Sequence, residues 1–257
     1  MYDYHMHSTV SFDARDTALN MALAAKARGL KEICFTDHLD YPPDANMAFD
    51  TAVYNAAYDN LEVPGLLIRK GMEFGLTPDN ADQLQKDLNR RPFDFVIGSV
   101  HLVGDADIYL EPYWVDKSYE EAIRLHLETT LECVRAHEDY DVLGHLTYIS
   151  KCTGNPRKEL LRYEDHKPIM DEILRELVKR GKGMELNTSG FDRCGGPLPT
   201  LDYFQRFYDL GGRIVTVGSD SHDTARVGQY THEMVAELKK IFGYVCTFED
   251  RKPIFHE

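Results

Sequence analysis

Histidines and acidic residues recur directly after short apolar, β-branched segments along most of this chain. These positions are occupied by His5, His7, His38, Glu73, His101, His145, Asp220 and His222. Side chains at the carboxyl ends of parallel strands converge at one edge of a sheet or one rim of a barrel. The pattern therefore predicts a fold in which most strands run parallel and end at a common site.

The segments between these positions alternate between strand-like and helix-like patterns. Strands are expected at residues 2–5, 33–36, 66–72, 93–100, 142–145, 183–187 and 213–218, and amphipathic helices between most of them. Residues 41–60 are expected to form a loop. Because short apolar strands separated by helices favour a covered parallel sheet, and about seven such units favour closure, we expect one α/β barrel domain over residues 1–257.

Local sequence also predicts where two of the helices begin. Asp13 or Asp16 is expected to cap the helix that passes through Leu19 and Leu23. Ser118 and Glu121 form a capping box ahead of a long amphipathic helix. The remaining histidines lie outside the predicted strand ends and are expected at the surface: His126, His137, His166, His232 and His256.

Composition limits which cellular compartment and which binding partners are expected. The formal net charge of −14 disfavours nucleic acid, which a protein binds mainly through basic side chains. The five cysteines form no Cys-x-x-Cys pair, so a disulfide framework is not expected and a reducing cytoplasm is. Residues 1–10 are too polar for a signal peptide, and no apolar run has the length of a membrane span.

The residue types at the strand ends suit divalent metals. Neutral imidazole binds zinc, iron and manganese, and carboxylates add charge and hardness. His5 and His7 flank one residue and should project to the same side, while Glu73 could bridge two cations. Two cations about 3.5–4 Å apart would hold a bridging hydroxide and the oxygens of a phosphoryl group, with no need for a serine or cysteine nucleophile.

Five motifs resemble the polymerase-and-histidinol-phosphatase (PHP) family. They are His5-Met6-His7, Thr36-Asp37-His38, Gly71-Met72-Glu73-Phe74-Gly75, Gly98-Ser99-Val100-His101 and Gly218-Ser219-Asp220-Ser221-His222. The resemblance covers residues 2 to about 228; segments 185–190 and 248–253 look like the histidinol-phosphate phosphatase branch. It implies a distorted seven-stranded, TIM-like (β/α) barrel that hydrolyses L-histidinol phosphate to L-histidinol and phosphate in histidine biosynthesis.

The resemblance also implies two or three divalent ions, which could be Zn, Mn or Fe. Carried over by position, His5, His7, Glu73 and Asp220 would hold the first ion, and Glu73, His101 and His145 the second. The third site would use His38, His222 and Asp13, where the family usually has a histidine. A carboxylate there favours manganese or iron over zinc. Glu73, Asp220 and His222 are the catalytic candidates, and the proton donor to the leaving group stays open between Asp220, His222 and a metal-bound water.

Substrate recognition is expected from two loop arginines. Arg157 follows the fifth strand and Arg193 the sixth, so both loops should border the site, and a guanidinium can bind a phosphate dianion through two hydrogen bonds. Each arginine is about equally consistent with a solvated loop residue. The expected substrate is a small phosphorylated amino alcohol, whose ammonium or imidazole could meet Asp40 or Asp44. The sequence does not indicate the oligomeric state.

Three other functions fit parts of the pattern. A PHP phosphoesterase acting on nucleotides or other small phosphate esters would want a more basic, aromatic groove. A metal-dependent amidohydrolase would carry a lysine at the end of the fourth strand, where this chain has His101. A metal-binding barrel without catalysis would bind the ions and show no turnover.

Overall fold

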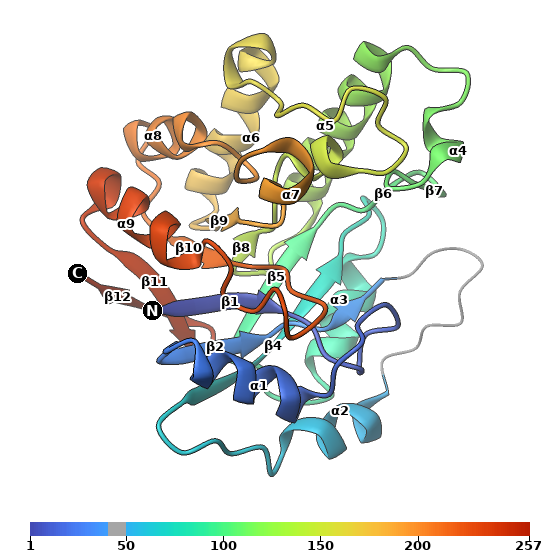
Figure 1. The fold of residues 1–257 in the computed structure, drawn as a ribbon. Helices are drawn as coiled ribbons and strands as arrows, with labels where there is room; N and C mark the ends of the chain where they lie inside the picture. The colour runs from blue at the N-terminus through green and yellow to red at the C-terminus, as the bar shows by residue number, and fades with distance from the viewer. Residues whose placement is uncertain (41–49) are drawn as a thin grey trace.

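The computed structural model describes residues 1–40 and 50–257 as a barrel of parallel strands surrounded by helices (Figure 1). Around the sheet the strands follow the order β1 (Tyr2–Met6), β2 (Glu32–Phe35), β4 (Leu67–Gly75), β5 (Phe95–Ser99), β8 (Val142–Leu143), β9 (Gly183–Asn187) and β10 (Val215–Gly218). Every one of these neighbouring pairs is parallel. All seven predicted strands are present, with ends that differ by a few residues.

The barrel is nearly closed where β1 meets the segment after β10. The His7 amide donates to the Ser221 carbonyl at 2.9 Å, and the Asp220 amide donates to the His5 carbonyl at 2.7 Å. These two bonds join the first and last strands at their carboxyl ends. The distorted seven-stranded α/β barrel expected from the sequence is therefore confirmed.

Helices cover the outside of the barrel. They include α1 (Ala18–Ala27), α3 (Ala81–Leu88), α5 (Tyr119–Ala136), α6 (Lys167–Lys179), α8 (Leu201–Asp209) and α9 (Thr231–Phe242). In α6 the side chains of Met170, Ile173, Leu174 and Leu177 are fully buried, which is the spacing of one helical face. A separate buried cluster that includes Tyr4, Phe95, Val142 and Phe248 lies apart from this outer layer.

Two local predictions were wrong. Residues 41–60 were expected to form a loop, but α2 (Thr51–Tyr58) lies within them, capped by Asp50 and anchored by buried Tyr54 and Tyr58. Its apolar face consists of aromatic residues that also suit loops. Residues 41–49, with the proposed Asp44, lie outside the described residues.

The first helix is capped by Thr17, whose hydroxyl accepts from the Asn20 amide, so neither Asp13 nor Asp16 is its cap. The capping box at Ser118 is confirmed.

Several short elements were not predicted because each has too few residues for a periodic pattern. They are β3 (His38–Leu39), β6 (Leu102–Val103), β7 (Ala106–Asp107), α4 (Glu111–Trp114), α7 (Phe191–Cys194) and the 3-10 turns η1 (Tyr148–Lys151) and η2 (Tyr163–Asp165). The chain ends in a hairpin of β11 (Val245–Glu249) and β12 (Lys252–His256). The ring of His256 stacks on Tyr2 with centroids 4.5 Å apart, so this hairpin lies beside the N-terminus (Figure 1).

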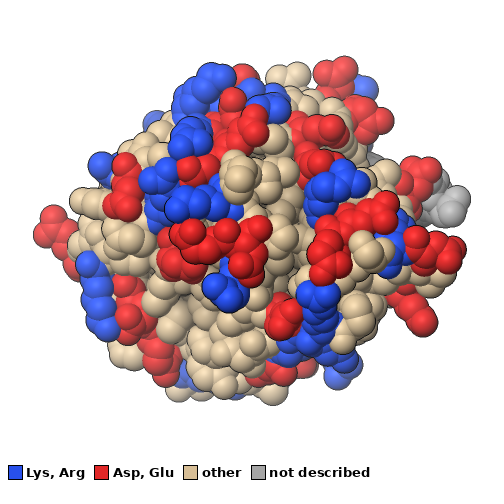
Figure 2. All heavy atoms as spheres, turned by 90° about the horizontal axis from the view of Figure 1, so that it is seen from above, with Lys and Arg blue, Asp and Glu red and all other residues tan. Residues whose placement is uncertain are grey.

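The histidines expected at the surface do not all lie there. His126, on α5, and His137, which follows it, are both 1% exposed. His126 lies on the buried face of α5, and His137 is the residue at which this helix ends. On the face shown in Figure 2, basic and acidic side chains are interspersed, without a continuous basic stripe on that face. None of the described helices is both long and apolar enough to cross a bilayer.

Candidate metal centre

Glu73 lies fully buried near the carboxyl end of β4, and its carboxylate is the centre of the site. Its Oε2 faces three imidazoles: His38 Nδ1 at 2.9 Å, His5 Nε2 at 3.2 Å and His7 Nε2 at 3.6 Å. β1 ends between the two histidines of the His-x-His motif, and β3 begins at His38. The structure therefore brings segments from three strands to one carboxylate oxygen.

The other oxygen of Glu73 faces a different pair of histidines. Oε1 lies 2.9 Å from His145 Nε2 and 3.4 Å from His101 Nε2, and it accepts a hydrogen bond from Ser99 at 2.7 Å. His101 follows β5, which pairs with β4, and His145 follows β8, which pairs with the other side of β5. A carboxylate with ligand groups on both oxygens has the arrangement that bridges two cations.

Asp220, after β10, completes the first of these two groups. Its Oδ1 lies 3.3 Å from His7 Nε2 and 3.7 Å from His5 Nε2. The backbone of Asp220 adopts φ = 54°, a left-handed conformation that aspartate tolerates better than most residues. Strained backbone of this kind tends to persist at functional sites. His5, His7, Glu73 and Asp220 thus converge as the sequence predicted.

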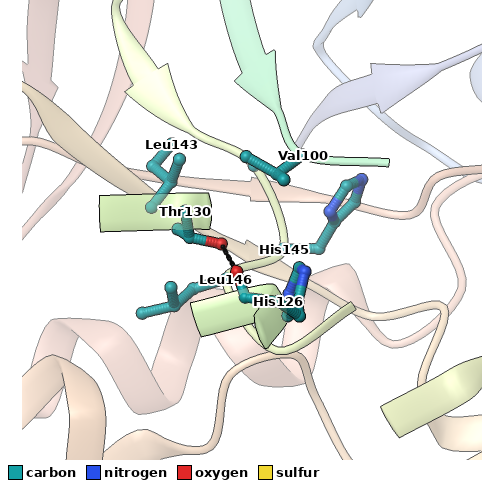
Figure 3. A pocket seen from close by; sticks show the side chains of 7 residues that line it. Val100, His126, Thr130, Leu143, His145 and Leu146 are labelled. Carbon is teal, nitrogen blue, oxygen red and sulfur yellow. Dashed lines mark hydrogen bonds between the residues drawn. The ribbon is translucent and has the colours of Figure 1, made fainter. Parts of the chain in front are cut away.

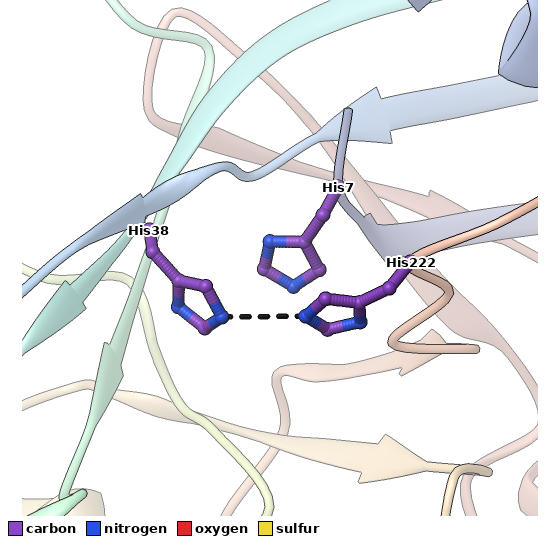
Figure 4. A group of neighbouring side chains, drawn as sticks. All are labelled: His7, His38 and His222. Atoms are coloured by element: carbon purple, nitrogen blue, oxygen red, sulfur yellow. Dashed lines mark hydrogen bonds between the residues drawn. The ribbon is translucent and has the colours of Figure 1, made fainter. Parts of the chain in front are cut away.

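A third group is formed by His38, His222 and Asp13 beside His7. Figure 4 shows the rings of His7, His38 and His222 facing one another, with the Nε2 atoms of His38 and His222 3.4 Å apart. Asp13 Oδ2 lies 3.2 Å from His222 Nε2 and 3.7 Å from His38 Nε2. Asp13 is thus beside these two histidines, rather than at the start of α1.

The buried donor atoms fit metal ions. Four of them, His5 Nε2, His7 Nε2, His38 Nδ1 and Glu73 Oε2, form no hydrogen bond of ordinary geometry within residues 1–40 and 50–257, although the three nitrogens lie 2.9–3.6 Å from that oxygen. A buried polar atom without a partner costs about 1–3 kcal/mol, so four around one point need compensation. Electron-pair donors of nitrogen and carboxylate type, all directed at one region, receive it from a divalent cation. Sets of three such donors within 4.8 Å of one another include His7, His38 and His222; His5, His7 and Glu73; and Glu73, His101 and His145.

The electrostatics of the site favour ionised carboxylates. Burial opposes the charge on Glu73, but the neighbouring histidines outweigh it and hold the pKa of Glu73 well below its usual range. Burial also opposes the charge on Asp220, and Lys151 and His5 together hold its pKa well below normal. Burial, followed by the charges of His222 and His38, lowers the pKa of His7. Both carboxylates are therefore in the anionic form that binds cations.

Glu185, on β9, is a functional residue that pattern analysis missed. Its Oε1 lies 2.5 Å from His5 Nδ1, and its Oε2 accepts from the His145 amide at 2.8 Å. A carboxylate behind a ligating histidine fixes which ring nitrogen carries the proton and which faces the metal. The sequence signal was Gly218, where a Cβ atom would collide with His5 and approach Glu185. The glycine leaves room for this pair.

Asp40 holds two other histidines in the same way. Its Oδ1 lies 2.9 Å from His101 Nδ1, and its Oδ2 lies 3.5 Å from His38 Nδ1. A Cβ atom at Gly75 would overlap the Asp40 carboxylate, which accounts for the glycine two residues after Glu73. Asp40 therefore contacts the candidate ligands, and not only a substrate as the sequence suggested.

Six of the candidate ligands line a hollow of about 710 Å³, and His5, His7 and Glu73 are buried beside them. Lys151 and Arg193 line it beside Asp13, His38, His101, His145, Asp220 and His222. Lys151 Nζ donates to Asp220 Oδ2 at 2.5 Å and to Ser189 Oγ at 2.7 Å. Pattern analysis missed this lysine, since a single lysine in a loop carries no signal.

The two predicted substrate arginines occupy different places. Arg193 lines the hollow, with its guanidinium 5.6 Å from the ring centroid of Tyr109. Arg157 does not: its guanidinium pairs with Glu120 at 2.6 Å and lies 3.9 Å from the Tyr119 ring centroid, about half exposed. The loop after β8 turns through η1, which directs Lys151 inward and leaves Arg157 outside. The geometry thus gives Arg157 no contact with the site.

Comparisons with known proteins agree with this site. Residues 3–189 match the family model described as the PHP domain. A histidinol-phosphatase of Lactococcus lactis subsp. lactis is 32% identical over 256 residues, which cover 97% of this chain and 95% of that protein. A probable histidinol-phosphatase of Thermotoga maritima is 29% identical, over 96% of this chain and 95% of its own.

Solved structures give the same result for the fold. The crystal structure of a histidinol phosphate phosphatase from Lactococcus lactis subsp. lactis, complexed with zinc, L-histidinol and phosphate, superposes with a TM-score of 0.88 at 32% identity, covering 98% of each chain. A Listeria monocytogenes protein described as a possible histidinol phosphatase superposes with a TM-score of 0.76 at 19% identity, covering 90% of this chain and 99% of its own. The second likeness concerns the fold alone.

Proposed function

This chain belongs to the PHP domain family, and from that premise we propose that it is a metal-dependent phosphatase that hydrolyses L-histidinol phosphate to L-histidinol and phosphate. The observation that carries the proposal is Glu73, whose two oxygens face two separate sets of imidazoles at the bottom of the hollow. The substrate comes from the full-length relatives, one of which was solved with L-histidinol and phosphate bound.

The site would hold two or three divalent ions. His5, His7 and Asp220 would bind the first together with Glu73, and His101 and His145 the second. His38, His222 and Asp13 would bind a third. Such ions supply a hydroxide nucleophile at neutral pH and offset charge on the phosphoryl oxygens. Zinc, manganese and iron all suit these donors, and the carboxylate of Asp13 favours the harder ions at the third position.

Two side chains on the wall of the hollow would bind the phosphate. Lys151 and Arg193 carry positive charge into a space whose bottom is formed by the metal ligands. Lys151 already contacts Asp220, so a phosphate next to that carboxylate would lie within reach of its ammonium. Positioning and charge compensation account for most of the catalysis of phosphoryl transfer, and these two cations provide both.

The remainder of the substrate would meet acidic and aromatic side chains. Asp105 and Asp107, at the β6–β7 hairpin, line the same hollow as Tyr109 and Phe12. A carboxylate pairs with an ammonium, and a flat ring can pack on an aromatic side chain. A small phosphorylated amino alcohol with an imidazole ring has a group for each. His222 is the most exposed of the candidate histidines, at 27%, so with only two ions bound it would suit a group that exchanges protons with the leaving alcohol.

The test compares turnover across substrates at matched metal content. The purified protein, analysed for bound metal, should hydrolyse L-histidinol phosphate with kcat/KM at least about 100-fold above that for other alkyl phosphates, a discrimination of about 2.7 kcal/mol. The panel should include a mononucleotide and a phosphodiester. Equal rates across the panel would overturn the substrate, and a preference for the nucleotide or the diester would favour a different phosphoesterase of the same family.

One variant tests whether the metal centre is catalytic or only binds metal. His101→Ala removes one imidazole from the Oε1 side of Glu73 while leaving the other ligands in place. The variant should fold, with an unchanged circular dichroism spectrum, and lose turnover. Arg157→Ala is the matched control, because that side chain contacts Glu120 outside the hollow and its loss should leave kcat/KM unchanged. Wild-type protein that binds metal and turns over none of the panel would contradict the enzymatic proposal.

A further inference from the structure

A small cavity lies behind the metal centre, between α5 and the loop after β8. Its volume of about 10 Å³ is about what a single buried water needs. It is lined by Val100, His126, Thr130, Leu143, Gly144, His145 and Leu146 (Figure 3). His145 lines both this cavity and the large hollow, so its ring separates the two.

His126 is the unusual residue of this cavity. It is 1% exposed, and neither of its ring nitrogens makes a hydrogen bond of ordinary geometry within the described residues, although the Leu146 backbone is close enough to affect the ring. Burial lowers the pKa of His126 to about 3, against a smaller opposing effect of the Leu146 backbone, so the ring is neutral and offers one donor and one acceptor. A neutral imidazole that is buried with so little hydrogen bonding destabilises the fold, and an apolar residue at this position of the helix would avoid that cost.

The two ring nitrogens of His145 lie on different sides of the imidazole, and one of them is directed at Glu73. Its Nε2 is directed at Glu73 Oε1, 2.9 Å away. No hydrogen bond among the described residues engages its Nδ1, although His5, His7 and His101 each have a partner for that atom in Glu185, Ser11 and Asp40. Figure 3 shows the rings of His126 and His145 at the same end of the cavity.

We propose that this cavity is a binding site for one structural water, which His126 anchors and which gives Nδ1 of His145 its hydrogen-bond partner. His126 is then a positioning residue that acts through the water on a metal ligand. Buried waters make about three hydrogen bonds on average. The ring of His126, the ring of His145 and the hydroxyl oxygen of Thr130 supply three, because that hydroxyl donates to the His126 carbonyl at 2.8 Å and keeps its lone pairs.

The consequence is a fixed tautomer for His145. A water that accepts from Nδ1–H leaves Nε2 with its lone pair directed at the metal side of the ring. Outer partners of this kind typically change metal affinity by about 10–100-fold when removed. The inference rests on the proposed metal centre, and not on the identity of the substrate.

The experiment replaces His126 and measures zinc binding without substrate. His126→Phe keeps a ring of similar shape and cannot anchor water; His126→Gln keeps a donor and an acceptor. The dissociation constant for zinc, from chelator competition, should rise about 10–100-fold in His126→Phe and recover most of the way in His126→Gln. The 15N shifts of His145 in the zinc-loaded protein should report one tautomer in wild type and in the Gln variant, and a changed tautomer balance in the Phe variant.

Two controls separate positioning from general damage. His137→Phe alters another buried histidine at the end of α5, one that bonds to the Thr77 carbonyl and does not line the cavity, so zinc affinity should stay at the wild-type value. If the His126→Phe protein does not fold, the same measurements are made on His126→Leu. Wild-type zinc affinity with unchanged His145 shifts in the Phe or Leu variant would overturn the inference, as would an equal loss in His137→Phe. Protein that shows the expected zinc effects and fails to hydrolyse L-histidinol phosphate would overturn only the proposed function.

Discussion

The two ends of the barrel are built from the same strands but differ in how their buried polar groups are paired. The open end is the one with the metal centre, and the closed end is the opposite one, beside the terminal hairpin. At the carboxyl ends of the strands, His5, His7 and Glu73 leave polar atoms without partners. At the other end, the hydroxyl of Tyr4 accepts from the Phe248 amide at 3.0 Å and donates to Glu32 at 2.5 Å. β1 thus contributes Tyr4, whose hydroxyl both accepts and donates, to one end. The next residue, His5, lies at the other end, and its Nε2 makes no hydrogen bond with the described residues.

The terminal hairpin of β11 and β12 covers the closed end. Arg69 bonds to Glu32 at 3.2 Å and to Glu249 of β11 at 2.7 Å. The rings of Phe248 and Phe95 pack with centroids 4.7 Å apart, and Phe248 is 1% exposed. Because the side chains of Tyr4, Glu32 and Arg69 have their partners among the described residues, that end should stabilise the fold without any ligand. At the open end, bound cations would have to compensate the buried polar groups instead. We therefore expect activity to depend on the open end and the stability of the fold on the closed end.

The largest expected effect is on activity, at the open end. Glu73→Gln removes the negative charge that faces both sets of imidazoles and replaces one oxygen by an amide that cannot bind a cation. We expect kcat to fall by more than about 10³-fold, beyond the 10–100-fold typical of outer partners. Wild type treated with a chelator should lose activity to the same level and regain it with added manganese or zinc. A Gln variant that keeps a tenth of the activity would show that Glu73 bridges no metals.

The next effect is on stability, at the closed end. Phe248→Ala removes a fully buried ring from the cluster around Tyr4 and Phe95, and should lower the free energy of unfolding by about 3–5 kcal/mol. Urea unfolding of the chelated protein measures it. Below the unfolding transition, kcat per folded molecule should equal that of wild type. A large fall in kcat at full folding would mean that the two ends are coupled, and the comparison would fail.

The open end was far more predictable from sequence than the closed end. A histidine or carboxylate after an apolar strand can be recognised from its own short stretch of sequence. The fold then brings those residues together because parallel strands end at one rim. The terminal hairpin gave no such signal. Its packing depends on Tyr4 and Phe248, which are 244 positions apart and look like ordinary apolar residues in any local window.

The residues that pattern analysis missed at the open end share one property. Glu185 and Asp40 lie behind histidines, and Lys151 reaches the site only because η1 turns it inward. Their roles depend on side-chain direction across strands, which spacing along one strand does not encode. Arg157 illustrates the converse: its loop borders the site, and its side chain turns to Glu120 instead.

The smallest effect compares two buried carboxylates, one at each end. Glu185 accepts hydrogen bonds from His5, from the His145 amide and from Asn187 Nδ2 at 3.3 Å, so it has only donors around it. A glutamine there can accept on one side and must present an NH₂ group to a donor on the other. Glu185→Gln should therefore weaken zinc binding by about 10–100-fold.

Glu32→Gln is the matched control, since Glu32 is also buried and accepts from Tyr4 and Arg69 at the closed end. It should leave zinc affinity unchanged and lower the free energy of unfolding of the chelated protein by about 1–3 kcal/mol, because Arg69 and Tyr4 lose a charged acceptor. Chelator competition and urea unfolding on both variants give a two-by-two comparison. If each substitution changed both quantities equally, binding and stability would not be divided between the ends of the barrel; if each changed only its own, the division would hold at the level of single carboxylates.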